Sequence, residues 1–176
     1  AEEESPSNYH LTVSNALDRM ETLIESLLRN ARGETQGQEI ESVDLTRLSE
    51  RCWQHIVHDE ATVEIDVDQA IYADVLQLTQ LLENLFRNAI EHGSQDAVIS
   101  IGALEDGFYV EDNGTGIPEA ERERITERGY STSSDGTGLG LAIVQEIADS
   151  HGWQLRATDS TTGGARFELT GVEFVT

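Results

Sequence analysis

The chain contains no lysine, one cysteine and two prolines. All 11 basic residues are therefore arginines, and they stand against 34 acidic residues for a net charge of -23. Such an acidic chain repels a phosphate backbone, so we expect no nucleic-acid partner. The single Cys52 excludes an intramolecular disulfide, and the chain has neither an apolar run of about eighteen residues nor a signal-peptide pattern. We expect a cytoplasmic chain and leave open the membrane attachment of a longer protein.

The acidic residues are spread over the whole chain rather than gathered in one tail. Their mutual repulsion favours solubility, is unfavourable at low ionic strength and is screened in concentrated salt. With the absence of lysine, this leads to the hypothesis of a halophilic, haloarchaeal-type protein. An ordinary acidic bias is the alternative.

Length and composition indicate one domain with an added helix. Residues 14–32 predict that N-terminal helix, because their apolar positions recur in alternating steps typical of a coiled-coil or bundle seam. The polar stretch 33–38 (GETQGQ) predicts a linker. We therefore divide the chain into the helix with its linker, residues 1–36, and a main domain, residues 37–176. The seam consists of Val13, Leu17, Met20, Ile24, Leu27 and Ala31.

Three helices are predicted in the main domain. Asp44 and Asp74 are typical N-cap residues, and Gln77 stands at capping-box spacing from Asp74. Glycine is typical of the position that follows a helix. The predicted helices run from about 45 to 57, from 75 to Gly93, and from 138 to 151 before Gly152.

Alternating apolar residues predict five strands in the same domain. Residues 61–67 form an edge or a central strand. A hairpin and a final pair of strands around a TTGG turn complete the set: 97–103 with 108–112, and 154–158 with 165–170. This mixture predicts an α+β fold, in which one mixed β-sheet is covered by helices on one face.

The first chemical motif is QLLENLFRNAIEHG, which contains Asn84 and Asn88. The two asparagines are four residues apart, so both amides lie on one face of the predicted helix. An amide oxygen is a hard neutral ligand that suits Mg²⁺. Two solvent-facing asparagines would be the interpretation if this motif stood alone.

The second motif is DNGTGIP, which begins at Asp112. Strand alternation turns Asp112 inward with Phe108 and Val110, and a buried carboxylate needs a hydrogen-bond donor. The exocyclic amino group of adenine is a suitable donor. Gly114 and Gly116 would let the backbone turn closely beneath the base. A simple Asn-Gly turn after a strand is the alternative.

The third motif is DGTGLGL, with Gly136, Gly138 and Gly140 at the start of a predicted helix. Bare backbone amides and the positive end of a helix bind phosphate groups. The motif lacks the lysine of a Walker A loop and the glycine spacing of the dinucleotide fingerprint. A flexible linker remains the alternative for this motif in isolation.

In this order the three motifs resemble the ATP-binding catalytic domain of sensor histidine kinases. That superfamily also contains DNA gyrase, mismatch-repair ATPases and heat-shock chaperone ATPases. The resemblance covers about residues 42–171. It implies the Bergerat α/β sandwich, here with an N-terminal coiled-coil-like helix, and a mobile lid over ATP between the two glycine-rich motifs.

The resemblance also implies a role for each matching residue, with ATP and Mg²⁺ as cofactors. Asn84 and Asn88 take the positions of the N box, with Asn88 as the Mg²⁺ ligand. His92 follows them, close to the phosphates. The adenine-binding G1 box corresponds to Asp112, Gly114 and Gly116, and the G2 box to Gly136, Thr137, Gly138, Leu139 and Gly140.

One position separates a kinase from a hydrolase. The gyrase-like ATPases have a water-activating glutamate four residues before the metal asparagine, where this chain has Asn84. Glu83 points about 100° away on the helix and is a poor substitute. Glu91 replaces a lysine that is frequent in the family, so another residue must neutralise the γ-phosphate. The candidates are Arg87, Arg124 and Arg128.

Two features depart further from the family pattern. Thr126 replaces the phenylalanine of the IFER-like box, and His10 lacks the sequence context of a phosphoacceptor. Residues 1–36 resemble the second helix of the dimerisation hairpin, so we expect the acceptor histidine on a helix upstream. The implied partners are that hairpin, in a homodimer, and the receiver domain of a response regulator.

The implied reaction is transfer of the γ-phosphoryl group of ATP to a histidine, followed by relay to an aspartate of the regulator. Two alternatives stay open. One is a gyrase-type ATPase that works as a conformational switch. The other is a degenerate module that binds a nucleotide or a partner without catalysis.

Overall fold

A computed structural model describes residues 20, 38–56, 60–93, 96–127 and 139–176. The chain divides into two compact units, Ala1–Gln38 and Glu39–Thr176. In the first unit Met20 is helical, and its side chain is exposed. The rest of the predicted N-terminal helix lies outside the described residues. None of the helices in the described ranges is long and apolar enough to cross a membrane.

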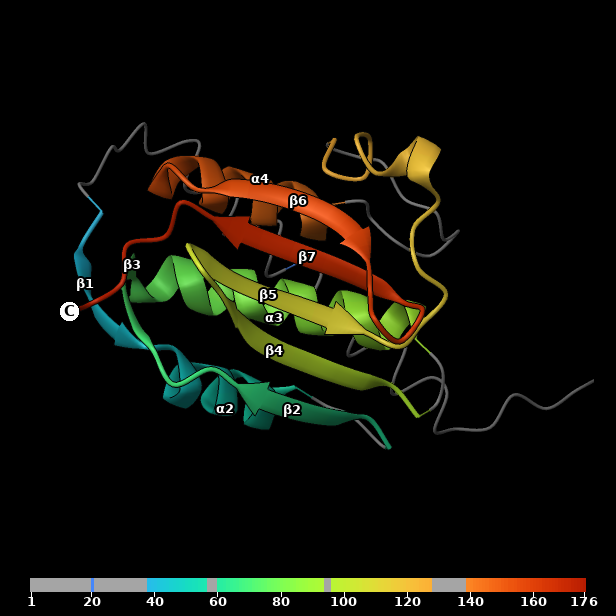
Figure 1. The fold of residues 1–176 in the computed structure, drawn as a ribbon, viewed down its shortest axis with the longest axis horizontal. Coiled ribbons are helices and arrows are strands. Elements are labelled where there is room, and N and C mark those ends of the chain that lie inside the picture. Colours follow the sequence, from blue (N-terminus) through green and yellow to red (C-terminus); the bar gives the residue numbers. More distant parts are fainter. Residues whose placement is uncertain (1–19, 21–37, 57–59, 94–95, 128–138) are drawn as a thin grey trace, which may run out of the picture. The chain divides into compact units, whose positions relative to one another are not determined.

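The second unit is built on a mixed five-stranded sheet with the strand order β2-β4-β5-β7-β6 (Figure 1). β2 and β4 are parallel, and the other neighbours are antiparallel. All five predicted strands are found, and β2 is an edge strand. Their bounds are β2 Thr62–Asp66, β4 Val98–Leu104, β5 Gly107–Asp112, β6 Gln154–Asp159 and β7 Ala165–Thr170.

Three helices lie on one side of this sheet (Figure 1). They are α2 Leu45–His55, α3 Val75–His92 and α4 Gly140–His151. The apolar side of α3 includes Leu78, Leu82, Leu85 and Ala89, all buried in the common core with the inner residues of the sheet. The predicted α+β sandwich is therefore confirmed.

Two helix boundaries differ from the prediction. α2 ends at His55, two residues early, and α4 begins at Gly140 rather than at 138. Gly152 follows α4 in the left-handed region, with φ 74°, as its position predicts. The preference of glycine for the end of a helix is a stronger local signal than any that marks the start of α4.

A second sheet of two antiparallel strands was not predicted. It pairs β1 Ile40–Asp44 with β3 Ala70–Asp74. Each strand is five residues long and ends on the aspartate that caps the next helix. Only Val43 is buried in β1, and the apolar residues of β3 lead directly into those of α3, so neither stretch shows the isolated alternation of β2, which is equally short.

Asp74 links the start of α3 to the end of α4. Its carboxylate caps α3 by accepting from the backbone N–H groups of Leu76 and Gln77. Its own N–H donates to His151 Nε2 at 3.0 Å. The capping-box spacing of Gln77 predicts a local partner for that N–H, whereas the histidine is 77 residues away in sequence. The contact ties the two helices together at one end.

Candidate active site

Asp112 lies at the end of β5, where strand alternation turns it toward the helices. Its side chain is only 6% exposed. Oδ1 accepts hydrogen bonds from the backbone N–H groups of Gly114 (2.8 Å) and Ala165 (3.2 Å). Burial raises the pKa of the Asp112 carboxyl above its usual value, and these two donors oppose that rise. The protein thus holds a desolvated carboxylate in a fixed orientation.

The turn between β6 and β7 packs directly against this carboxylate. A Cβ on Gly164 would lie 2.2 Å from both the backbone oxygen and Oδ1 of Asp112. Thr162 Oγ1 donates to the same backbone oxygen at 3.2 Å. Sequence reasoning treated TTGG only as a turn and missed these residues. Two consecutive glycines were the available sign of a close backbone approach.

Gly114 and Gly116 make the sharp turn after Asp112. Gly116 has φ 73°, a conformation that favours glycine. Gly114 leaves no room for a side chain, since its Cβ would lie 2.9 Å from the backbone oxygen of His92. The turn therefore lies against the last residue of α3.

Asn84, Asn88 and His92 follow one another at intervals of four on α3, so they share a face of that helix. Asn84 is 8% exposed, and its Nδ2 donates to the backbone oxygen of Gln80 at 2.8 Å. Its other amide atom, Oδ1, lies 3.3 Å from the position of a Cβ on Gly140. Asn84 is thereby placed beside the first residue of α4.

Among the described residues, no side chain caps the N-terminus of α4. Leu139 occupies the N-cap position and makes no side-chain cap hydrogen bond. The first N–H groups of a helix have no partner inside the helix and attract anions. Of the other predicted site residues, Gly136, Thr137, Gly138 and Arg128 lie outside the described residues.

Three of the charged residues considered in the sequence are exposed or only partly buried. Arg87 Nη2 lies 3.8 Å from Glu83 Oε2, one turn back on α3. Glu91 is exposed on the last turn of the same helix. Arg124 is exposed on the turn that follows the short helix η1 Glu119–Glu121. The buried part of the site is therefore formed by amides, glycines and one carboxylate.

α3 joins the two ends of this arrangement. Its last residue, His92, adjoins the Gly114 turn beside Asp112, whereas Asn84 adjoins Gly140 at the start of α4. Eight residues of helix separate them, a length of about 12 Å. The carboxylate and its glycine turn lie at one end, and a helix N-terminus without a cap among the described residues lies at the other. This arrangement suits an elongated ligand that carries phosphate groups.

Comparison with known proteins agrees with this geometry. Residues 73–172 match the family described as "Histidine kinase-, DNA gyrase B-, and HSP90-like ATPase". The chain belongs to this family. The match includes the asparagine helix, both glycine-rich motifs and the last two strands of the large sheet. The prediction of an ATP-binding catalytic domain of the sensor histidine kinase type is confirmed.

Several relatives that match this chain are named histidine kinases. The sensor histidine kinase ZraS of Escherichia coli O157:H7 is 34% identical over 86% of this chain and 35% of its own length. The ATP-binding domain of PrrB from Mycobacterium tuberculosis is 26% identical, with a TM-score of 0.61 over 78% of this chain and 99% of that one. The chain thus spans about a third of ZraS and nearly all of an isolated ATP-binding domain.

A second similar structure is that of the histidine kinase ThkA in complex with the response regulator protein TrrA. It is 24% identical, with a TM-score of 0.68 over 100% of this chain and 53% of that one. At this identity the likeness concerns the fold.

Proposed function

We propose that this chain binds Mg²⁺-ATP and supplies the γ-phosphoryl group for transfer to a histidine. The observation that carries the proposal is the buried amide of Asn84 beside Gly140 at the N-terminus of α4. This places a neutral side chain, not a base, next to the backbone amides that would hold the phosphates. Such a site favours transfer to an acceptor over hydrolysis.

Asp112 binds the adenine in this proposal. Both hydrogen bonds that the described residues donate to its carboxylate end on Oδ1. Oδ2 is then the oxygen that accepts from the exocyclic amino group of adenine. Gly114 and Gly116 keep side chains away from the base.

Asn88 binds the metal, and the start of α4 binds the phosphates. The Asn88 amide oxygen is a hard donor one helical turn from Asn84, which suits an ion that keeps most of its waters. When bound, Mg²⁺ supplies charge that stabilises the phosphoryl group in transfer. Leu139 and Gly140 begin the helix whose N–H groups would hold the phosphates, together with Gly136, Thr137 and Gly138. Arg124 and Arg128 neutralise the negative charge of the γ-phosphate in this proposal.

The acceptor histidine belongs to a dimerisation hairpin, of which residues 1–36 are the second helix and linker. The working protein is then a homodimer. Because ThkA forms a complex with a response regulator, the receiver domain of such a regulator is the proposed final acceptor.

The first test is calorimetric titration with Mg²⁺-ATP, comparing the native chain with Asp112→Ala and Asn88→Ala. Asp112→Ala should abolish binding, and Asn88→Ala should remove its dependence on Mg²⁺. Asp66→Ala is a matched control, because Asp66 also ends a strand but is exposed at the sheet edge. A folded native chain that fails to bind ATP, or steady ATP hydrolysis without an acceptor, would contradict the proposal.

A further inference from the structure

A second buried carboxylate adjoins Asp112 on the other side of the sheet. Glu111 is 7% exposed, and strand alternation turns it away from the helices that pack behind Asp112. A buried charge is costly unless ion pairs and hydrogen bonds compensate it, and even a compensated pair seldom increases stability. The role of Glu111 is therefore to be sought in the segment that its carboxylate contacts, rather than in overall stability.

Glu111 binds the turn between β6 and β7. Its carboxylate accepts from Thr161 twice, from Oγ1 at 3.1 Å and from the backbone N–H at 3.3 Å. Arg166 Nη1 lies 3.5 Å from Glu111 Oε2, the oxygen that also accepts from the Thr161 N–H. Both partners come from the chain that follows β6, about fifty residues away in sequence.

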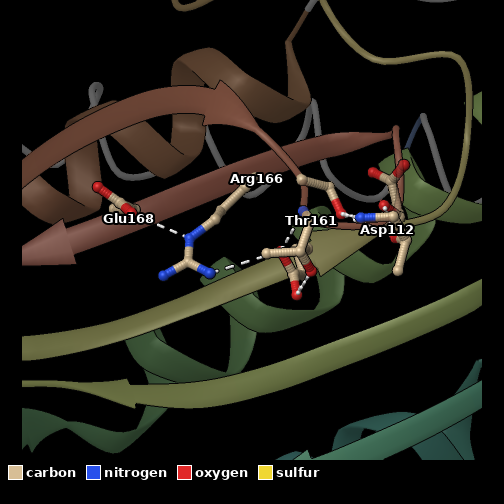
Figure 2. Close-up of polar contacts among 7 residues, drawn as sticks. Asp112, Thr161, Arg166 and Glu168 are labelled. Atoms are coloured by element: carbon tan, nitrogen blue, oxygen red, sulfur yellow. Dashed lines mark hydrogen bonds and ion pairs between the residues drawn. The ribbon is translucent and has the colours of Figure 1, made fainter.

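Arg166 is itself held from two further directions. Its Nε donates to Glu168 Oε1 at 2.9 Å, and its guanidinium lies 3.6 Å from the centroid of the Tyr109 ring. Figure 2 shows Glu168, Arg166, Thr161 and Asp112 following one another toward the end of β5. The side chain of Glu111 is thereby fixed between a rigid cation and the turn.

The same turn sets the position of Asp112. Ala165, at its end, donates its N–H to Asp112 Oδ1, and Thr162 donates to the backbone oxygen of Asp112. A Cβ on Gly164 would lie 2.2 Å from the backbone oxygen and from Oδ1 of Asp112, so this position has no room for a side chain. A shift of the turn would therefore move or remove contacts on the carboxylate.

We propose that Glu111 is a positioning residue, which holds the 160–165 turn so that Ala165 and Gly164 orient the Asp112 carboxylate toward adenine. This inference rests on the proposed function, because it assigns the adenine to Asp112. Glu111 itself points to the opposite face of the sheet and does not touch the nucleotide. Its effect should therefore concern recognition of the base and not of the phosphates.

The decisive experiment compares ATP with inosine triphosphate, in which an oxygen replaces the 6-amino group. In Glu111→Gln, the affinity for ATP should fall about five- to tenfold, the equivalent of roughly one hydrogen bond. The affinity for inosine triphosphate should change by about twofold or less, because position 6 of that base is an acceptor and cannot donate to Asp112 as the amino group of adenine does. Calorimetry on the folded proteins gives both constants.

Glu64→Gln is the matched control. Glu64 pairs with Ser100, and Ser100 pairs with Glu111, so both glutamates lie in one row across the sheet. Glu64 is exposed on the edge strand β2 and should leave both affinities unchanged. Equal losses for the two nucleotides in Glu111→Gln, or no loss for either, would overturn the positioning role.

Thr161→Val tests the same contact from the turn, with Thr62→Val on β2 as its control. It removes the hydroxyl donor to Glu111 while keeping the side-chain volume, and should reduce the preference for ATP in the same direction. Without nucleotide, hydrogen exchange of the Ala165 amide should accelerate in Glu111→Gln and in Thr161→Val, whereas exchange at the centre of β4 should not change. If Glu111→Gln does not fold, the nucleotide preference of Thr161→Val decides the question.

These outcomes also separate the two proposals. A native chain that does not bind ATP contradicts the proposed function and this inference together. In the other case the native chain binds ATP and loses this binding in Asp112→Ala, while Glu111→Gln and Thr161→Val keep the native preference for ATP over inosine triphosphate. That result contradicts only the inference.

Discussion

Asp112 is a buried carboxylate whose surroundings favour its neutral form. Desolvation raises its pKa, and the N–H groups of Gly114 and Ala165 offset only part of that effect. Folding therefore disfavours the ionised form, so the stability cost of Asp112 is present above its folded pKa and disappears as the pH falls below the ordinary value near 4. A residue that lowers stability at neutral pH is typical of a binding site.

Asp112→Asn separates these two effects. The amide oxygen still accepts from Gly114 and Ala165 without a buried charge, so the variant should be at least as stable as the native chain at pH 7. This advantage should shrink as the pH falls through the pKa of Asp112. ATP affinity should drop about ten- to hundredfold, because an NH₂ group then faces the amino group of adenine. Urea unfolding between pH 7 and 4, together with calorimetry, measures both; a clearly less stable variant at pH 7 would contradict the argument.

The β6–β7 turn is an element whose importance comes from what it touches. It contacts Asp112 on the helix side and Glu111 on the other side of the sheet. Two different physical reasons require glycine at positions 163 and 164. Gly163 has φ 101° with open space around it, whereas Gly164 lacks room for a side chain.

Gly164→Ala should therefore be more harmful than Gly163→Ala. The added methyl of Gly164→Ala meets backbone atoms of Asp112 and Gly114, so we expect a stability loss of about 1–3 kcal/mol and loss of ATP binding. Gly163→Ala carries only backbone strain, roughly 1–2 kcal/mol, and should retain most of the ATP affinity. Thermal unfolding and calorimetry compare the two. Equal affinities in both variants would show that crowding at Gly164 does not reach the carboxylate.

Charge is the property that acts on the whole molecule. The net charge of -23 is distributed over both units, so repulsion opposes folding throughout rather than at one site. At about 1 M salt the Debye length is roughly 3 Å, and most of this repulsion is screened. The halophilic hypothesis makes a direct prediction from this.

Raising KCl from about 0.2 to 2 M should stabilise the protein by about 1–2 kcal/mol, which corresponds to a melting temperature higher by roughly 3–8 °C. Sucrose of equal osmolarity is the control, because it is excluded from protein surfaces without screening charge. A melting temperature that depends equally on both additives, or on neither, would favour an ordinary acidic bias.

Local patterns in the sequence were sufficient for most of the secondary structure and for the family. Apolar periodicity located the five strands of the large sheet, and Asp74 with Gly93 delimited α3. The two asparagines and the two glycine-rich motifs were recognisable because spacing along a helix or a turn decides which groups share a face. The strands β1 and β3 were missed because β1 buries only Val43 and β3 leads directly into α3, so neither shows an isolated alternating run.

The sequence by itself determined the local elements, the family and the acidic character, because each depends on residues close together in the chain or on composition alone. Only the tertiary structure decided which distant segments meet. It brought His151 to Asp74, Gly140 to Asn84, and the β6–β7 turn to both Asp112 and Glu111. Each of these contacts joins residues more than forty positions apart, and strand order and helix packing determine such contacts, not local propensity.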